Sequence, residues 1–237
     1  MIDPEMLVRI YTGLDREGPG EPADVAWAIA RLGLSGRISI CDAGCGSGAD
    51  SATLAELLPQ AQITAIDQLP HLVKEAQARC GSLANVTVRQ GDMADLTGRH
   101  DLIWSAGALY FLGVTEGLRR WRDALATNGS VAFSEPVLLG PPDDTVSAFW
   151  KGYPAITDLD GIVARIDAAG FELLDHRVIV GAPWARYYTR FAAHLATLRA
   201  EDDPDLRAAV ATCEREIAMW RAAQDRIAYA LMLVRPR

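Results

Sequence analysis

The sequence predicts an α/β protein, and three observations carry that prediction. From about residue 38, short runs rich in β-branched residues alternate with segments of helical periodicity, which is typical of stacked βαβ units. The chain has 237 residues, enough to bury a large core within one domain. Its side chains are 50% hydrophobic and 23% charged, as in ordinary globular proteins, which excludes a collagen or a disordered chain.

Seven segments are expected to form strands, with helices between them. Pro59 ends one helix, Pro70 opens the next, and Asn128-Gly129 is expected to turn the chain into the fifth strand. The expected strands are residues 37–42, 62–67, 86–90, 101–105, 130–134, 171–180 and 226–234. The helices expected between them are residues 51–58, 70–80, 116–126 and 158–169.

Two stretches lie outside this alternation. Residues 1–36 are expected to form a helical cap over the carboxyl edge of the sheet, interrupted by a glycine-rich break at 13–20. Residues 183–225 carry two apolar stripes at helical spacing and are expected to form a helical lid. Neither stretch is flanked by a linker-like run, so we expect a single domain over residues 1–237, with its core at 37–182 and its last strand at 226–237.

Charge and composition restrict the partners and the location. The 23 Lys and Arg against 31 Asp and Glu give a formal net charge of -8, which lacks the basic footprint of a nucleic-acid-binding protein and favours a small-molecule substrate. The charge-free stretch at 102–115 is too short to cross a bilayer, and the N-terminus is acidic where a secretory signal is basic. We therefore expect a cytoplasmic protein without membrane contact. The four cysteines and four histidines are too scattered for a disulfide framework or a metal site.

The most informative stretch is residues 42–48, Asp-Ala-Gly-Cys-Gly-Ser-Gly, between an expected strand and an expected helix. Glycines there let the backbone turn sharply and approach a ligand, and the helix N-terminus offers free N–H groups to an anion. Gly44, Gly46 and Ala49 also satisfy the G-x-G-x-x-G/A pattern of dinucleotide-binding proteins, so this stretch alone leaves an NAD(P) enzyme open.

Acidic residues at three expected strand ends distinguish the cofactor classes. Asp42 precedes the first glycine, where a carboxylate can hold an ammonium group or orient the loop. Asp67 ends the second strand, where an acid accepts hydrogen bonds from ribose hydroxyls in both classes. Asp92 and Met93 follow the third strand and suit the amino group and the face of adenine. This third acid favours S-adenosylmethionine (SAM) over NAD.

These stretches resemble the class I SAM-dependent methyltransferases, over residues 38–135 in particular. The matching segments are residues 40–48, 66–67, 90–93, 101–105 and 125–130. Residues 13–20 and 104–110 further resemble a bacterial subgroup that methylates small molecules of unsettled identity, although Asp15 and Ala106 stand where those relatives carry Pro and Glu. The resemblance implies a Rossmann-like, mostly parallel sheet of seven strands whose last strand is antiparallel, with the lid inserted before it.

The resemblance also implies a set of cofactor contacts. The glycine loop would surround the methionine part of SAM, with Asp42 near its ammonium group, and Asp67 would bind the ribose, flanked by Gln68. Asp92 and the backbone of Met93 would bind adenine. The remaining expected contacts border the sulfonium or close over the cofactor carboxylate. The full set is Tyr11, Arg16, Asp42, Gly44, Cys45, Gly46, Gly48, Asp67, Gln68, Asp92, Met93, Ser105 and Ala106.

Methyl transfer from a sulfonium is an in-line displacement, so positioning and a dry pocket supply most of the rate. Where the acceptor carries a proton, Glu135 and Tyr110 are the candidate bases, and each could instead be structural. Aromatic residues of the lid and of the segment after the fifth strand could hold the acceptor or simply pack. They are Trp150, Tyr153, Trp184, Tyr187 and Tyr188.

Two alternatives of other classes stay open. A short-chain NAD(P)-dependent oxidoreductase would need a Tyr-x-x-x-Lys pair, and neither Lys74 nor Lys151 has a tyrosine four residues before it. A non-catalytic SAM-binding or dimerisation module is suggested by the missing acid at Ala106. We expect SAM as cofactor, S-adenosylhomocysteine (SAH) as product, and a possible homodimer through the lid.

Overall fold

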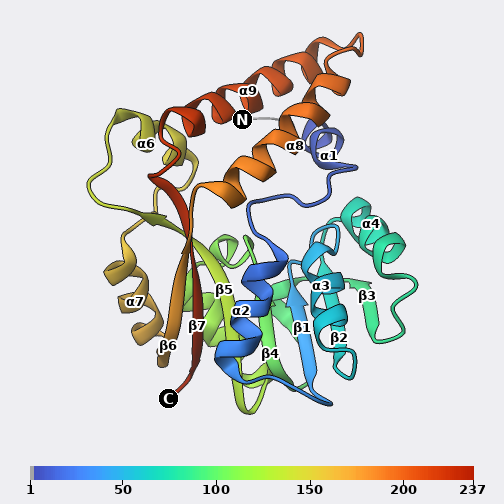
Figure 1. Ribbon diagram of the computed structural model, residues 1–237, viewed down its shortest axis with the longest axis vertical. Helices are drawn as coiled ribbons and strands as arrows, with labels where there is room; N and C mark the ends of the chain where they lie inside the picture. The colour runs from blue at the N-terminus through green and yellow to red at the C-terminus, as the bar shows by residue number, and fades with distance from the viewer. Residues whose placement is uncertain (1–2) are drawn as a thin grey trace.

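A computed structural model describes residues 3–237; the first two residues of the expected cap lie outside the described residues. It contains one seven-stranded sheet of order β3-β2-β1-β4-β5-β7-β6 (Figure 1). Strand β7 is antiparallel to both of its neighbours, and the other paired strands are parallel, which confirms the predicted fold class. The strands are β1 Ser39–Ala43, β2 Gln62–Asp67, β3 Val86–Gln90, β4 His100–Ser105, β5 Leu125–Leu138, β6 Phe171–Ile179 and β7 Ile227–Pro236.

The strand order reverses at β1, which has β2 on one side and β4 on the other. In open α/β sheets ligands bind outside the carboxyl ends of the strands at such a reversal, because the connecting helices leave in opposite directions and open a crevice there. The glycine loop that follows β1 lies at this point. The topology thus positions the predicted cofactor residues at one edge.

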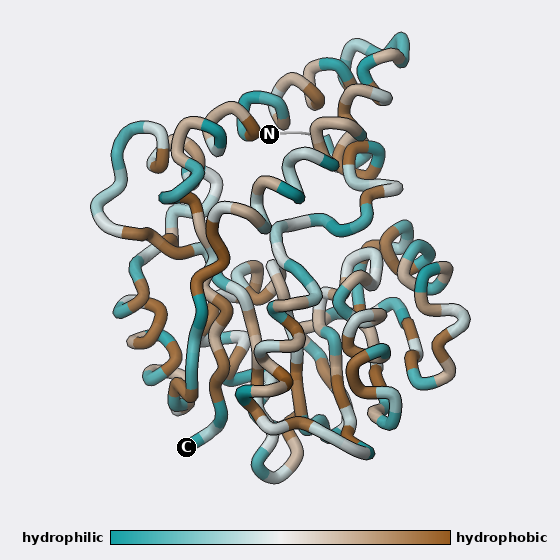
Figure 2. Tube along the Cα trace, in the orientation of Figure 1, coloured by the Kyte–Doolittle hydropathy of each residue, from teal (hydrophilic) through white to brown (hydrophobic). Residues whose placement is uncertain are grey.

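Helices cover both faces of the sheet. Apolar side chains of α2, Pro22–Leu32, and α3, Ala49–Leu57, pack on one face, and those of α5, Val114–Trp121, and α7, Leu159–Ala168, pack on the other. Helix α4, Pro70–Cys80, packs beside α3 against β2 and β3. Figure 2 shows the apolar residues gathered along the strands between these layers.

Helix α1, Pro4–Tyr11, of the expected cap lies with the lid above the carboxyl edge (Figure 1), whereas α2, the second helix of that stretch, packs on a face of the sheet, so the expectation of a cap over the edge was wrong for α2. Helix α1 packs against α9, Pro204–Ala222, which pairs with α8, Ala182–Leu198. Helix α6, Asp144–Phe149, also contacts α9. The lid is inserted between β6 and β7, as expected. Single-turn helices complete the chain: η1 Met93–Asp95, η2 Leu109–Phe111, η3 Arg122–Ala124 and η4 Trp150–Gly152.

The prediction for residues 116–126 and 130–134 was wrong in its boundaries. Helix α5 ends at Trp121, and strand β5 begins at Leu125, where it pairs with His100 across an irregular register. The Asn128-Gly129 pair lies within β5, with Asn128 at a φ of 64°, and a Cβ on Gly129 would lie 2.6 Å from the carbonyl oxygen of His100. These residues therefore kink the strand instead of preceding it. Over residues 3–237, no helix has the length and apolar character needed to span a membrane.

Candidate functional site

The glycine loop between β1 and α3 is fixed by its own backbone. The amides of Gly44 and Cys45 both donate to the carbonyl of Ile66 at the end of β2, at 2.8 and 2.9 Å. Gly44 and Gly46 have φ values of 78° and 55°, which L-residues with a side chain rarely adopt. A Cβ on Gly44 would lie 2.5 Å from the Cβ of Ala108, so the loop also needs glycine for close packing.

Two of the predicted acids lie at the carboxyl ends of neighbouring strands, and one of them contacts this loop. Asp67, at the end of β2, accepts hydrogen bonds from the amides of Gly46 and Leu69, each at 2.9 Å. Asp92 caps η1 by accepting from the amide of Ala94 at 2.8 Å, and the carbonyl of Met93 accepts from the Trp121 indole at 2.7 Å. The neighbouring Gln68 is exposed. The structure therefore places the predicted ribose and adenine residues along one edge.

Asp42 lies inside β1 and is 2% exposed. Its carboxylate accepts a hydrogen bond from the hydroxyl of Ser51 in α3 at 2.5 Å. Burial, and then the nearby charge of Asp50, raise the pKa of Asp42 to about 7. This bond ties the strand to the helix on either side of the glycine loop. Of the two roles considered for Asp42, the geometry favours orienting the loop.

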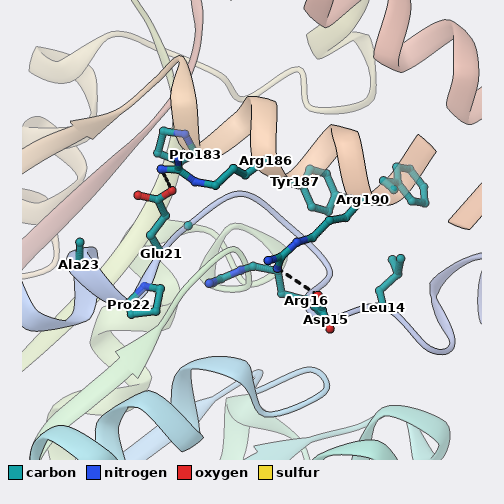
Figure 3. A pocket seen from close by; sticks show the side chains of 12 residues that line it. Leu14, Asp15, Arg16, Glu21, Pro22, Ala23, Pro183, Arg186, Tyr187 and Arg190 are labelled. Atoms are coloured by element: carbon teal, nitrogen blue, oxygen red, sulfur yellow. Dashed lines mark ion pairs between the residues drawn. The ribbon is translucent and has the colours of Figure 1, made fainter. Parts of the chain in front are cut away.

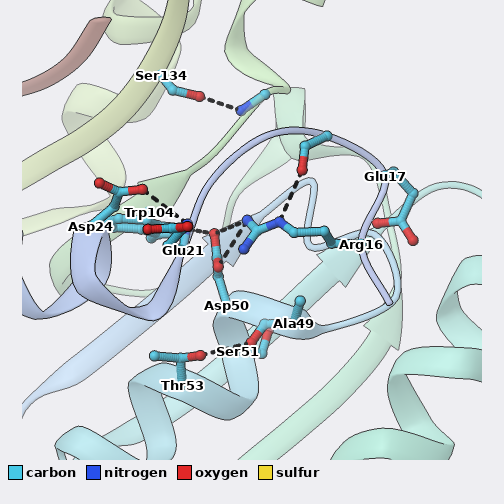
Figure 4. Close-up of polar contacts among 12 residues, drawn as sticks. Arg16, Glu17, Glu21, Asp24, Ala49, Asp50, Ser51, Thr53, Trp104 and Ser134 are labelled. Atoms are coloured by element: carbon cyan, nitrogen blue, oxygen red, sulfur yellow. Dashed lines mark hydrogen bonds and ion pairs between the residues drawn. The ribbon is translucent and has the colours of Figure 1, made fainter. Parts of the chain in front are cut away.

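Arg16 joins the cap to the core. Its guanidinium donates to both carboxylate oxygens of Asp50 at 3.1 and 3.2 Å and to the carbonyl of Gly18 at 3.0 Å (Figure 4). Asp50 also accepts from the Trp104 indole at 3.1 Å. The Arg16 side chain is 18% exposed and that of Asp50 9% exposed, so the pair is largely shielded from water. Arg16 thus connects the cap loop to α3 through Asp50, which in turn is hydrogen-bonded to β4.

Glu17, the next residue, was not singled out from the sequence. One of its carboxylate oxygens, Oε2, accepts from the amide of Ser47 in the glycine loop at 3.2 Å. The same oxygen fills the place where a Cβ on Gly46 would lie. The other oxygen, Oε1, is buried and has no partner within residues 3–237. Burial also raises the pKa of Glu17. A carboxylate with a free oxygen therefore lies directly on the loop.

Ser105 is the last residue of β4, and Ala106 follows it beside this loop. The Ser105 hydroxyl donates to the carbonyl of Ala43 at 2.8 Å, and the amide of Gly107 donates to the hydroxyl of Ser134 at 2.7 Å. The thiol of Cys45 is buried and donates to the carbonyl of Gly46 at 3.6 Å. Gly48 begins α3 with a φ of 81°, packed against Ala76. These contacts shape the edge between the glycine loop and the end of β4.

Glu135, a candidate base, is fully buried in β5. Its Oε1 accepts from the Tyr153 hydroxyl at 2.5 Å and lies 3.6 Å from the Arg165 guanidinium, whereas Oε2 has no partner within the described residues. Burial raises the pKa of Glu135 to about 7, and the Tyr153 bond opposes that rise. Tyr110, the other candidate, packs on Tyr153 with ring centroids 5.6 Å apart.

Under the lid, aromatic residues from distant parts of the chain pack together. Tyr11 stacks on Phe191 at 5.6 Å, and Phe191 stacks on Tyr187 at the same distance. Tyr11 thus belongs with the lid and not with the glycine loop. Trp184, Trp150 and the β7 residue Tyr229 form a neighbouring group, with Trp184 and Tyr229 centroids 5.0 Å apart. The lid aromatics predicted from the sequence are brought together here.

A pocket of about 350 Å³ opens between the cap loop and α8 (Figure 3). Tyr187 and Phe191 line it, and so do three arginines: Arg16, Arg186 and Arg190. Arg186 pairs with Glu21 and Arg190 with Asp15, while Arg16 is held by Asp50. Within residues 3–237, no group of three His, Cys, Asp or Glu side chains could hold a metal ion.

Comparison with known proteins identifies the domain. Residues 40–129 match a family model described as a methyltransferase domain. Over 73 residues the chain is 37% identical to a trans-aconitate 2-methyltransferase of Deinococcus radiodurans, covering 31% of this chain and 28% of that protein. It is 30% identical over 161 residues to another of Streptomyces avermitilis, covering 63% of this chain and 60% of that protein. The chain thus spans less than two thirds of the length of these curated relatives.

Solved structures share the fold over the whole chain. A SAM-dependent methyltransferase from Geobacter sulfurreducens, solved in complex with SAH, has a TM-score of 0.87 at 19% identity and covers 100% of this chain and 99% of its own. One from Thiobacillus denitrificans, also with SAH, has the same TM-score and identity with full coverage of both chains. Residues 40–129 therefore match a methyltransferase domain, and the fold of the whole chain is shared with these two structures, in agreement with the resemblance.

Proposed function

We propose that this chain is a class I SAM-dependent methyltransferase that transfers a methyl group from SAM to a small-molecule acceptor. The observation that carries the proposal is the glycine loop held against Asp67, within the residues that match the methyltransferase domain. That match favours methyl transfer over the NAD(P) alternative, which the loop pattern alone left open.

The residues at the carboxyl edge fit SAM. Gly44 and Gly46 give the close backbone approach that a bound ligand needs, and Asp67 offers carboxylate oxygens suited to ribose hydroxyls. Gln68 would flank the ribose, and Asp92 with the backbone of Met93 would bind adenine. When bound, SAM supplies a methyl group on a positively charged sulfur, which a nucleophile displaces in line.

Glu17 is the group we assign to the ammonium of the cofactor. Its buried Oε1 lacks a partner, and a buried carboxylate oxygen without one is costly. An ammonium group would satisfy it and would lower the pKa of Glu17 toward its usual range. Asp42 would then act through Ser51 by orienting the loop. Arg16 would hold the cap in place from Asp50 instead of binding the cofactor carboxylate.

Near the end of β4, Ser105 and Ala106 would border the transferred methyl group, with Tyr110 beside them. Glu135 would accept the proton that the acceptor loses, because its pKa of about 7 suits a general base at neutral pH. Its partner-free Oε2 is the atom available for that proton. Tyr110 would line the acceptor site and exclude water from it.

Several properties of the whole chain belong to the same proposal. We expect residues 1–237 to act as one cytoplasmic domain, since no linker-like run divides the sequence. The net charge of -8 supports a small-molecule acceptor over a nucleic acid. A homodimer through the lid helices and the absence of membrane contact stay predictions.

The test is a calorimetric titration of the purified protein with SAM, SAH and NADH, followed by measurement of SAH formation with candidate acceptors. Trans-aconitate is included because the curated relatives carry its name. We expect micromolar binding of SAM and SAH, no binding of NADH, and SAH formation with at least one acceptor. Binding of NADH alone would overturn the proposal, and SAM binding without turnover of any acceptor would favour the non-catalytic module.

A further inference from the structure

Two residues from outside the cofactor edge contact Glu135. Its Oε1 accepts from the hydroxyl of Tyr153 at 2.5 Å and lies 3.6 Å from the guanidinium of Arg165. Both residues belong to the segment between β5 and β6, which also forms α6, η4 and α7 (Figure 1). Both also lie outside the residues that match the methyltransferase model. The surroundings of Glu135 are therefore built by a part of the chain separate from the glycine loop.

Backbone contacts fix the positions of these two residues. The segment that follows Tyr153 is attached to β5, because the amide of Leu138 donates to the carbonyl of Thr157 at 2.9 Å. The guanidinium of Arg165 donates through Nη2 to the carbonyl of Ala155, in the same segment, and presents Nη1 to Glu135. The hydroxyl and the guanidinium thus approach Oε1 from positions that the fold of this segment determines.

The two oxygens of the Glu135 carboxyl group have different environments. Oε1 accepts the Tyr153 hydrogen bond, whereas Oε2 is buried and has no hydrogen-bond partner within residues 3–237. The whole side chain is 0% exposed, so bulk water does not reach it. A carboxylate oxygen that already accepts a hydrogen bond has less capacity to take a proton than one that accepts none. The arrangement therefore selects Oε2 for proton uptake.

The titratable groups around Glu135 come from four elements. Tyr153 follows η4, Arg165 lies in α7, Tyr110 in η2 and Tyr229 in β7. The tyrosines are neutral at neutral pH, so Arg165 supplies the positive charge. Burial raises the pKa of Glu135, and the Tyr153 hydrogen bond and then the Arg165 charge oppose that rise. The Arg165 side chain is 30% exposed, so water reduces its effect on Glu135.

Glu135 also lies next to the turn that follows β4. Ser134, the residue before it, accepts a hydrogen bond from the amide of Gly107 at 2.7 Å. Ala108, in the same turn, packs so closely on the glycine loop that a Cβ on Gly44 would lie 2.5 Å from its own Cβ. The turn therefore contacts both the glycine loop and the strand that carries Glu135.

We propose that Tyr153 and Arg165 are positioning residues for methyl transfer: they fix Oε1 of Glu135, favour the ionised carboxylate and leave Oε2 to take the proton of the acceptor. This inference rests on the proposed function, because it assigns the residues that prepare the base of that reaction. The proton of the acceptor passes to Oε2, and the electron pair that held it forms the new bond to carbon. The pair of the broken carbon–sulfur bond stays on sulfur.

The test follows the titration of Glu135 itself, by NMR of isotope-labelled glutamate carboxyl groups in the protein saturated with SAH. Glu135→Gln identifies the signal by removing it. Tyr153→Phe removes the hydroxyl and keeps the ring, and Arg165→Gln removes the charge. We expect each to raise the midpoint of Glu135 by about one pH unit, because the ionised form loses a hydrogen bond or a nearby positive charge. An unchanged midpoint in either variant would overturn the role of that residue.

Conservative and distant substitutions serve as controls. Arg165→Lys keeps the charge and should have a midpoint closer to wild type than Arg165→Gln. Tyr188→Phe is matched to Tyr153→Phe, because the Tyr188 hydroxyl donates at 2.8 Å to a different carboxylate, that of Glu216 in α9. Arg237→Gln removes an arginine that pairs with Asp167 and is 56% exposed. We expect Tyr188→Phe and Arg237→Gln to leave the midpoint unchanged, and a shift of the same size in them would overturn the assignment.

Activity separates this inference from the proposed function. With an acceptor that yields SAH, the pH at which kcat decreases should move upward with the Glu135 midpoint in Tyr153→Phe and Arg165→Gln, at an unchanged KM for SAM. Shifted midpoints without this change in kcat would show that Glu135 is not the base. Unshifted midpoints with normal turnover would defeat only the positioning role. If no acceptor is turned over, the proposed function fails, and the NMR titration still decides whether Tyr153 and Arg165 hold the carboxylate.

Discussion

The glycine-loop edge and the aromatic layer under the lid are built in opposite ways. The first comes from short contiguous stretches and is held by backbone hydrogen bonds, such as those from Gly44 and Cys45 to Ile66. The second gathers side chains from α1, η4, α8 and β7, which are far apart in the sequence. Backbone geometry tolerates few substitutions, whereas a set of side chains can be replaced one by one. The glycine-loop edge is therefore constrained by shape, and the aromatic layer by composition.

The largest effect is expected at the glycine loop. Gly46→Val should abolish detectable SAM binding while the protein still folds, because the new side chain would occupy the place of the Glu17 carboxylate and force a positive φ on valine. Calorimetry measures binding and circular dichroism measures folding. Gly140→Val is the control, since Gly140 also has a positive φ but no atom lies within 4 Å of its Cβ position. Normal binding by Gly46→Val would show that the cofactor lies elsewhere.

The next effect concerns Glu135. Glu135→Gln should lower kcat by about 100-fold for an acceptor that loses a proton, because it removes the general base. With a pKa of about 7, Glu135 is a carboxylate above that pH and protonated below it. The wild-type kcat should therefore fall as pH drops through about 7, and the variant should lack this decrease. Glu172→Gln, at the exposed pair with Arg235, is the control. If kcat of Glu135→Gln still decreased as pH drops through about 7, the base would be another residue.

A smaller loss of SAM affinity is expected when Asp67, at the same edge, is replaced. Asp67→Ala should weaken SAM binding by about 1–3 kcal/mol, since a charged hydrogen-bond partner of the ligand is lost. Asp101→Ala removes an acid that accepts from the Ser39 amide at 2.8 Å, at the far end of β1, and should leave SAM affinity intact. An unchanged affinity in Asp67→Ala would contradict the assigned ribose contact.

The smallest effect is expected where the two regions meet. Arg16→Ala removes the ion pair with Asp50 and should weaken SAM binding by less than about tenfold, because the role that we propose for Arg16 is to hold the cap and not to bind the cofactor. It should also lower the melting temperature. Arg120→Ala, at the exposed pair with Glu116, is the control for both measurements. Loss of SAM binding as complete as in Gly46→Val would make Arg16 a direct ligand.

Local signals made the cofactor edge predictable from the sequence. The 42–48 loop has glycines in a strand-to-helix context, and Asp67 and Asp92 each end a run of β-branched residues. The seven strands were predictable for the same reason, because each is a short apolar run with turn-forming or polar residues on either side. Residues 125–129 were misassigned, since Leu125 continues the helical stripe of Leu118 and Trp121 while its pairing with His100 is a long-range contact.

The aromatic layer under the lid was only partly predictable. The lid stripes indicated which aromatic residues face inward, but nothing in the sequence showed that Tyr11 and Tyr229 would join them. Glu216 did leave a signal, since it sits between Cys213 and Ile217 on the apolar face of its helix, where a charge is unusual. Glu17 left none, because a loop without periodicity gives no information about which side chains point inward.

The position of β7 has a consequence for synthesis on the ribosome. Strand β6 is made before the lid, yet its pairing partner in the sheet is β7, which is made after the lid and fits between β5 and β6. Until residues 227–236 emerge, β5 and β6 both present unpaired edges, and such edges promote aggregation of nascent chains. Strands β1 to β4 are complete earlier in synthesis, so the insertion of β7 is the step that removes the last unpaired edges from the nascent chain.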